Sequence, residues 1–199
     1  DFETIINDPE VRIIVETMGG VHPAYEFTKR ALLAGKSVCT SNKELVAKHG
    51  PELLEIARQG DINYLFEASC GGGIPIIRPL NSSLTADEID EITGILNGTT
   101  NYILTKMASD GSSFEDALKE AQDNGFAERN PEADVEGYDA CRKIAILSSL
   151  AFGCHVDFED IYTEGITKIT ATDIKYAQAI GTSIKLLATS RKLGEGFYA

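Results

Sequence analysis

The residues best suited to chemistry gather around a polar loop and the start of an apolar helix. Asp139 and Lys143 are spaced i and i+4, which places both on one helical face, and Glu128 and Asp134 lie in the irregular stretch 125–137 that precedes them. On spacing alone, a solvated ion pair worth about 0.3–0.5 kcal/mol is the simplest interpretation. The apolar neighbours of Lys143 favour burial instead, and a buried lysine can donate or accept a proton.

A second candidate is the glycine run in residues 66–75, FEASCGGGIP. Glycines permit positive φ, so this turn can present backbone carbonyls or amides to a ligand, although a closely packed turn without a ligand fits as well. No GK[ST] follows, which excludes a phosphate loop of the Walker type. Cys70 could act as a thiolate nucleophile, but no histidine can be assigned as its base, and a structural thiol is the better interpretation.

A third candidate is the sequence VETMGG at residues 15–20, where a strand runs into a loop before a helix. Open α/β sheets bind nucleotides at this position. The GxGxxG fingerprint is missing from the chain, so the residues predict only half of a dinucleotide site.

The first 66 residues alternate between strand and helix patterns. Short apolar strands are predicted at 11–15, 37–40 and 61–66, with helices that begin at Pro23 and at Asn42–Lys43. This β-α-β-α-β order predicts a parallel sheet with crossover helices.

A second structural unit is predicted from about residue 67. Helix 114–121 has Ser112 or Ser113 as its cap, and Asp173 helps to start helix 172–180. The remaining helices are predicted at 74–80, 101–107 and 138–152, and the strands at 88–96 and 183–191.

Composition narrows the class of protein. The 199 residues carry 18 Lys+Arg against 31 Asp+Glu, and the net charge of −13 argues against nucleic acid and anionic membranes as partners. Apolar runs fall far short of the roughly 20 residues of a membrane helix. The four cysteines form no CxxC and the three histidines no HExxH, so zinc-site spacing is absent and thiols in a reducing cytoplasm are expected.

Six ordered motifs together resemble homoserine dehydrogenase across nearly the whole chain. They are VETMGG (15–20), TSNKE (40–44), EASCGGGIP (67–75), GILNGTTNY (94–102), residues 121–128 and DVEGYDACRK (134–143). The resemblance implies an α/β fold, with a partial Rossmann-like nucleotide domain over 1–66 followed by an α+β substrate-binding and dimerisation domain over 67–199. It also implies interconversion of L-aspartate 4-semialdehyde and L-homoserine with NADPH or NADH, in threonine and methionine biosynthesis.

The resemblance assigns roles to individual residues. Lys143 matches the catalytic lysine that protonates the carbonyl oxygen, and Lys43 a lysine beside the nicotinamide and the substrate. The residues matched to substrate binding are Glu128, Asp139, Asp134, Gly98 and Thr99, the last two in a loop.

Cofactor, cation and partner follow from the same resemblance. The cofactor groove is matched by Thr17, Met18, Gly19, Gly20, Lys43 and Gly125. A monovalent cation, sodium, is matched by the carbonyls of Glu67, Cys70, Gly72 and Ile74. A cytoplasmic homodimer is expected.

Two other hypotheses remain. The first β-α-β half of the nucleotide domain is expected to be missing before Asp1, and the closing segment after Ala199. The isolated chain is therefore expected to bind cofactor poorly, and it could be a non-catalytic dimerisation module. A phosphorylating aldehyde dehydrogenase with Cys70 as its nucleophile is the third hypothesis.

Overall fold

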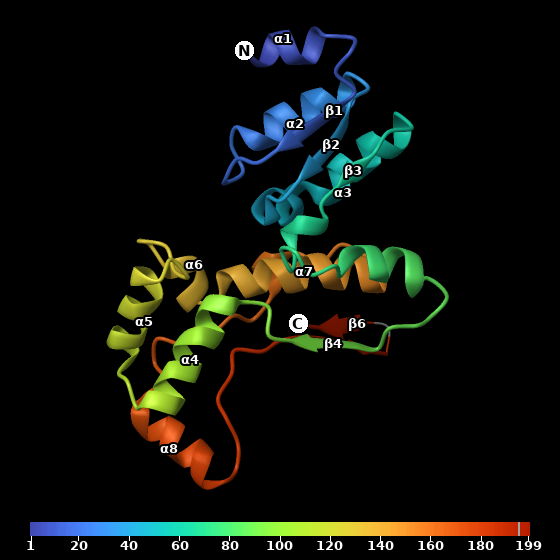
Figure 1. Ribbon diagram of the computed structural model, residues 1–199. Helices are drawn as coiled ribbons and strands as arrows, with labels where there is room; N and C mark the ends of the chain where they lie inside the picture. The colour runs from blue at the N-terminus through green and yellow to red at the C-terminus, as the bar shows by residue number, and fades with distance from the viewer. Residues whose placement is uncertain (195) are drawn as a thin grey trace. The chain divides into compact units, whose positions relative to one another are not determined.

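The computed structural model describes residues 1–194 and 196–199, and it forms two compact units (Figure 1). Unit 1 comprises Asp1–Ile89 and Ala145–Asp160, and unit 2 comprises Asp90–Ile144 and Ile161–Ala199. The division falls within helix α7 (Tyr138–Phe152), whose predicted bounds are confirmed. Compact units need not coincide with functional domains, so the predicted boundary between a nucleotide domain (1–66) and a substrate domain (67–199) stays a prediction.

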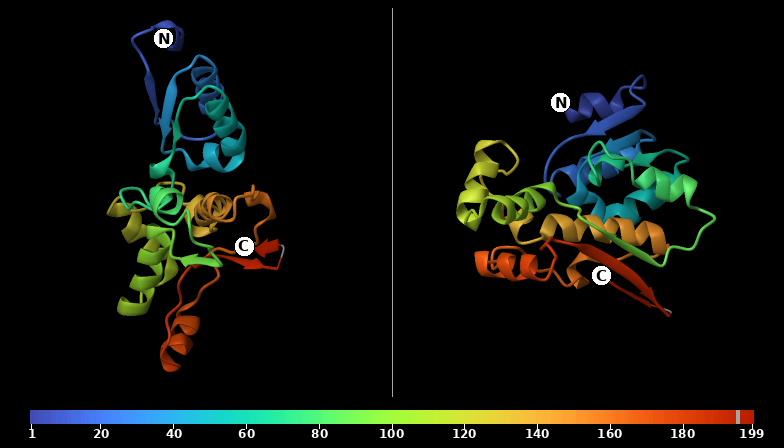
Figure 2. Two further views of the ribbon diagram at one scale, coloured as in Figure 1. Left: turned by 90° about the vertical axis from the view of Figure 1, so that its right-hand side faces the viewer. Right: turned by 60° about the horizontal axis from the view of Figure 1, so that its bottom comes forward.

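Unit 1 is built around a three-stranded parallel sheet in the order β1-β2-β3. Its elements are α1 (Phe2–Asn7), β1 (Ile13–Glu16), α2 (Ala24–Leu33), β2 (Ser37–Thr40), α3 (Lys43–Gln59), β3 (Tyr64–Leu65), the turn η1 (Glu67–Ser69), the π-helical segment η2 (Pro79–Ser83) and η3 (Phe158–Asp160). The parallel β-α-β-α-β order is confirmed. Both crossovers run in the same direction along the sheet, which places α2 and α3 on one face, as the left view of Figure 2 shows.

The two faces of this sheet differ in burial. Val38 is fully buried on the helix-covered face, whereas Ile13, Val15 and Leu65 on the other face are exposed. Alternate residues of a strand point to opposite faces, and the register pairs Val15 with Cys39 and Cys39 with Leu65, so these side chains form one row. Among the described residues of unit 1, no helix covers the second face, which is therefore an apolar surface.

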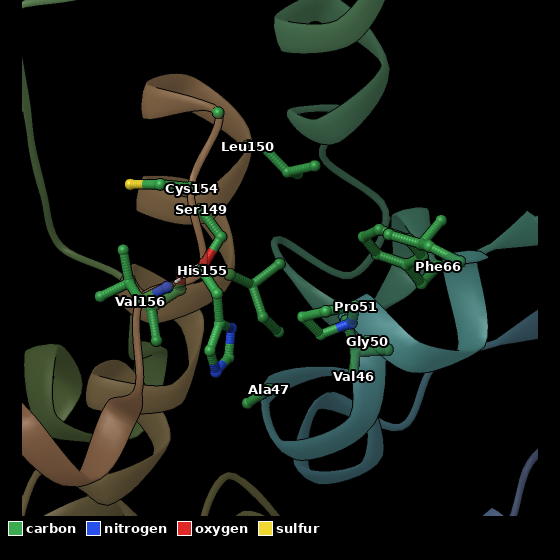
Figure 3. A pocket seen from close by; sticks show the side chains of 14 residues that line it. Val46, Ala47, Gly50, Pro51, Phe66, Ser149, Leu150, Cys154, His155 and Val156 are labelled. Carbon is green, nitrogen blue, oxygen red and sulfur yellow. Dashed lines mark hydrogen bonds between the residues drawn. The ribbon is translucent and has the colours of Figure 1, made fainter.

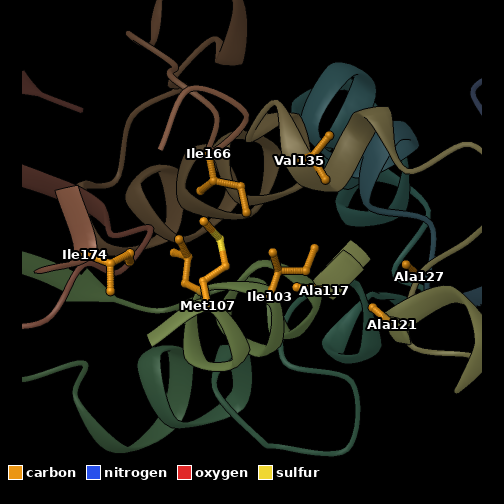
Figure 4. Packing of buried hydrophobic residues seen from close by; sticks show 9 residues of the cluster. Ile103, Met107, Ala117, Ala121, Ala127, Val135, Ile166 and Ile174 are labelled. Carbon is orange, nitrogen blue, oxygen red and sulfur yellow. The ribbon is translucent and has the colours of Figure 1, made fainter. Parts of the chain in front are cut away.

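Unit 2 combines helices with a three-stranded antiparallel sheet in the order β4-β5-β6. Its elements are β4 (Glu91–Gly94), α4 (Gly98–Asp110), α5 (Phe114–Asp123), α6 (Glu132–Val135), the first half of α7, α8 (Ala171–Ala179), β5 (Ala188–Leu193) and β6 (Gly196–Tyr198). A core of nine buried residues packs α4 against α5, α6 and α8 (Figure 4), with Ile103, Leu104 and Met107 of α4 at its centre. Among the described residues, we find no helix with the length and apolar character needed to span a membrane.

Several predicted bounds are wrong. The helix expected at 74–80 is irregular as far as Ile76 and helical afterwards. The Glu67 carboxylate accepts hydrogen bonds from the backbone N–H groups of Ile76, Ile77 and Arg78 and so fixes the helix start. Helix α4 begins at Gly98 rather than at 101, because Asn97 caps it. The helix α1 was not predicted.

The strands of unit 2 are also displaced from the predicted ranges. β4 covers 91–94 of the expected 88–96, and β5 covers 188–193 instead of 183–191. Pairing sets these ends, since Glu91–Gly94 pair with Ala188–Arg191 and the rest of β5 pairs with β6. The cap of α5 is confirmed as Ser113, whose hydroxyl accepts the N–H of Asp116 at 3.1 Å.

Candidate functional site

Asp139 and Lys143 form a closely packed ion pair in the first turns of α7. Lys143 Nζ lies 2.7 Å from Asp139 Oδ2 and donates a second hydrogen bond to the carbonyl of Leu96 at 2.9 Å. The exposed fraction is only 16% for the Lys143 side chain and 7% for the Asp139 side chain. The pair is therefore largely buried, and a solvated surface bridge does not describe it.

A buried asparagine, Asn97, connects this pair to Asp134, which lies in α6 within the stretch 125–137 that was predicted to be irregular. Its Nδ2 donates to Asp134 Oδ1 at 2.6 Å and to Asp139 Oδ2 at 2.9 Å. Unit 2 thus brings together three of the predicted residues, Asp134, Asp139 and Lys143, around one amide that sequence reasoning did not single out. The cluster holds the Lys143 ammonium against Asp139, and the amide joins Asp139 to the second carboxylate, Asp134, in a largely buried site. An ammonium held in this way can take part in proton transfer.

Glu128 does not share this burial. It is exposed in the loop after α5, where its backbone carbonyl accepts a hydrogen bond from Gln122 Nε2 at 3.0 Å. An exposed carboxylate can contact a ligand from solvent, so the substrate role of Glu128 stays a prediction.

The start of α4 contacts the same loop. Thr99 Oγ1 donates to the carbonyl of Phe126 at 2.7 Å, directly after Gly125, which has a φ of +74°. Gly98 and Thr99 were expected in a loop, but they form the first turn of α4. The structure therefore places Gly98, Thr99 and Gly125 on one surface of unit 2.

In unit 1 the carboxyl ends of β1 and β2 carry a buried polar network. Glu16 accepts hydrogen bonds from the Met18 N–H at 2.5 Å and from Thr40 Oγ1 at 2.6 Å. Asn42 donates to the carbonyl of Gly20 at 2.6 Å and caps α3 by accepting the N–H of Leu45. The network holds the loop after β1 against the start of α3.

This edge of the sheet carries the residues matched to the cofactor groove. Thr17, Met18 and Gly19 are exposed in the held loop, Gly20 has a φ of +73°, and Lys43 is the first residue of α3. Sequence reasoning did not assign roles to Glu16, Thr40 and Asn42. Their position at or just after the carboxyl ends of two parallel strands is the signal that could have identified them.

The glycine turn after β3 is fixed by its own backbone. Gly71 and Gly72 have φ of +76° and +57°, and a Cβ on Gly71 would lie 2.6 Å from the carbonyl oxygen of Ile74. The Cys70 side chain is 1% exposed, which leaves its thiol out of reach of a substrate and argues against the nucleophile hypothesis. Among the described residues, three or more His, Cys, Asp or Glu side chains do not converge on a metal position.

A separate pocket of about 370 Å³ lies within unit 1 (Figure 3). Residues of α3 and of the segment 145–156 line it, mostly with apolar side chains, and the His155 ring points into the space. The Ser149 hydroxyl is already used, since it donates to the Ala145 carbonyl and accepts the N–H of Val156. Catalytic pockets carry convergent polar groups, so we do not regard this one as the reactive site.

A parallel sheet with crossover helices on one face assigns unit 1 to the nucleotide-binding class of α/β folds. Residues 1–67 match the family model described as the NAD-binding domain of homoserine dehydrogenase, and residues 75–196 match the homoserine dehydrogenase model. The chain belongs to the homoserine dehydrogenase family.

Individual relatives agree with the family models. The chain is 50% identical over 188 residues to the homoserine dehydrogenase of Synechocystis sp., a match that covers 94% of this chain and 43% of that protein. It superposes on the crystal structure of a homoserine dehydrogenase from Thiobacillus denitrificans with a TM-score of 0.95 and 46% identity, covering 99% of this chain and 46% of that one. A hyperthermophilic archaeal homoserine dehydrogenase in complex with NADPH gives a TM-score of 0.83 at 30% identity, with 96% and 56% covered. The chain thus spans less than half the length of the Synechocystis relative.

Proposed function

We propose that this chain is part of an NAD(P)-dependent homoserine dehydrogenase that interconverts L-aspartate 4-semialdehyde and L-homoserine. The observation that carries the proposal is the buried Asp139–Lys143 pair, with its 2.7 Å contact, in a chain that belongs to this family. Hydride addition to an aldehyde develops negative charge on oxygen, and a nearby ammonium can stabilise that charge and give up a proton to it.

In this proposal Lys143 is the proton donor. It protonates the aldehyde oxygen during reduction and accepts the hydroxyl proton of L-homoserine during oxidation. Asp139 and Glu128 hold the polar groups of the substrate, and Asp134 supports Asp139. The first turn of α4 cradles the substrate through Gly98 and Thr99.

The nicotinamide cofactor supplies or accepts the hydride when it is bound. The held loop after β1 fits such a group, because ligands of open α/β sheets bind at the carboxyl ends of the strands. We assign Thr17, Met18, Gly19 and Gly20 to this groove, with Gly125 as a backbone contact and Lys43 beside the nicotinamide. The bound NADPH of the archaeal relative supports this cofactor class.

We also propose a sodium site at the glycine turn, with the carbonyls of Glu67, Cys70, Gly72 and Ile74 as ligands. Hard cations favour oxygen ligands, and the geometry at Gly71 supports the proposal, since only a residue without Cβ lets the Ile74 carbonyl fold back over the turn. For unit 2 we propose homodimer formation through the β4-β5-β6 sheet, whose outer face is exposed at Glu91 and Thr93.

The test uses a chimaera in which residues 1–199 replace the matching segment of the Synechocystis relative. We expect oxidation of L-homoserine with NADP or NAD, and Lys143→Ala to lower kcat by about 10²–10⁴-fold, the usual contribution of a general acid or base. Lys106→Ala is the matched control, because Lys106 lies on α4 of the same unit in an ion pair with Asp110. Unchanged turnover in Lys143→Ala would exclude the proton-donor role, and light scattering on the same sample measures whether it is a dimer.

A further inference from the structure

We propose that Asn97 is the positioning residue of this site: its side-chain amide sets the two carboxylates and, through Asp139, the ammonium of Lys143. The proposal rests on the proposed function only for the role of Lys143 as proton donor. Family resemblance assigned a role to Gly98 and Thr99 beside it but none to Asn97.

The orientation of the Asn97 amide follows from its partners. Its Oδ1 lies 2.8 Å from the backbone N of Thr100, and a backbone N–H can only donate, so this atom must be the acceptor oxygen. The amide nitrogen then faces the acids, 2.6 Å from Asp134 Oδ1 and 2.9 Å from Asp139 Oδ2. The side chain is buried, and each of its two N–H bonds has a carboxylate acceptor.

A neutral double donor is the group that this position requires. Two carboxylates from different helices would repel each other in a largely buried site, and the amide holds both without adding charge. An aspartate at 97 would add a third like charge, and a serine hydroxyl has a single hydrogen to donate. Either residue could still cap α4, so capping alone does not require asparagine.

The same segment also fixes the lysine directly. The carbonyl of Leu96, one residue before Asn97, accepts a hydrogen bond from Lys143 Nζ at 2.9 Å, and Asp139 Oδ2 accepts from both the lysine and the amide. Two donor directions of the ammonium are therefore set by Leu96 and by an acid that Asn97 holds. Proton transfer needs this placement, because a donor is effective only within hydrogen-bonding reach of its acceptor.

The simpler alternative is that Asn97 serves only as the N-cap of α4. A cap affects helix stability, whereas a positioning residue also affects the state of the Lys143 amine. The two roles can be separated with variants that keep the cap of α4 but change the N–H donors, or the charge, that face Asp134 and Asp139.

The experiment measures acetylation of Lys143 in the 199-residue chain by brief treatment with acetic anhydride at pH 8 and peptide mass spectrometry. Lys106, on α4 and paired with Asp110, is the internal reference. We expect Asn97→Ser to raise the labelling of Lys143 relative to Lys106 by about two- to tenfold, the equivalent of one lost hydrogen bond. We expect Asn97→Asp to lower it by about threefold or more, because a third carboxylate attracts the Lys143 ammonium and holds it more tightly in the site.

Ser113→Ala is the matched control, since it removes the cap of α5 in the same unit and should leave the labelling ratio unchanged. Equal ratios in the wild type and in whichever Asn97 variant keeps its circular dichroism spectrum would overturn the proposal. The labelling ratio of Lys143 to Lys106 can be measured without enzymatic turnover. Opposite shifts in the 199-residue chain together with an inactive chimaera would therefore uphold the positioning role and reject the proposed function. Equal ratios together with an active chimaera would reject the positioning role and uphold the proposed function.

Discussion

Replacing one member of the buried Asp139–Lys143 pair should cost more stability than the pair itself contributes. Lys143→Met leaves a carboxylate with 7% exposure and without the ammonium 2.7 Å away. Asp139→Asn removes the carboxylate from the ammonium, which keeps its hydrogen bond to the carbonyl of Leu96 at 2.9 Å. In both variants one charge stays buried and loses its partner in this ion pair.

The size of the effect follows from this burial. Breaking a fully buried pair costs about 3–5 kcal/mol, because the remaining charge is uncompensated. The Lys143 side chain keeps 16% exposure, so water reaches it and reduces the expected loss below that range, to about 2–3 kcal/mol for each single variant. The double variant removes both charges and should lose no more than about 3 kcal/mol, which gives a coupling energy of about 2 kcal/mol.

Urea unfolding of the four proteins measures this coupling in a double-mutant cycle. The chain has seven tyrosines and no tryptophan, so tyrosine fluorescence can be compared with far-ultraviolet circular dichroism to check that both report one transition. Lys106 and Asp110 provide the matched control, with the same i,i+4 spacing and a 2.8 Å contact but 26% and 47% exposure. We expect their coupling to lie close to the measurement error, since solvent screens an exposed pair. Equal coupling energies for the two pairs would refute the reasoning from burial.

Two further predictions concern unit 1. Gly71→Ala should destabilise the chain by about 1–3 kcal/mol more than Gly72→Ala in urea unfolding. Both glycines have positive φ, but only at Gly71 would the added Cβ lie 2.6 Å from the Ile74 carbonyl oxygen. Equal losses of stability in the two variants would contradict this prediction. Burial lowers the pKa of His49 below its ordinary value of 6.5, so the unfolded chain takes up the proton first as the pH falls. The free energy of unfolding should therefore be highest above pH 6.5 and decrease as the pH falls from 7.5 to 5.5, and this decrease should be smaller in His49→Gln; an identical pH dependence in the variant would reject the assignment.

Elements with local signals could be predicted from the sequence. The predicted bounds of β2 and α7 are confirmed, since the glycine that ends the helix before β2 and the long apolar stretch of α7 are signals within the local sequence. The start of the helical segment after Ile76 could not be predicted in this way. Its backbone N–H groups are satisfied by Glu67, nine to eleven residues earlier, and this contact exists only once the turn has formed.

In the candidate site, too, the local spacing could be predicted from the sequence and the long-range contacts could not. The i,i+4 spacing of Asp139 and Lys143 predicted that they share a face, but their burial depends on packing, and the sequence alone favoured a solvated pair. Asn97 lies 42 residues from Asp139 in the chain, so no local pattern predicted their hydrogen bond. Glu16 and Thr40 lie on different strands, so no local pattern predicted their hydrogen bond either.

The segment Leu96–Asn97 joins the stability of unit 2 to the geometry of the site. It follows β4, caps α4 through the Asn97 side chain, and supplies both the Leu96 carbonyl and the amide that surround the ion pair. A change that shifts β4 by one residue would move the cap, the carbonyl and the amide together, because successive residues of a strand point to opposite sides. The placement of Lys143 is therefore a property of the β4–α4 connection as much as of α7, and core substitutions that alter this connection should affect the site even where they contact none of its side chains.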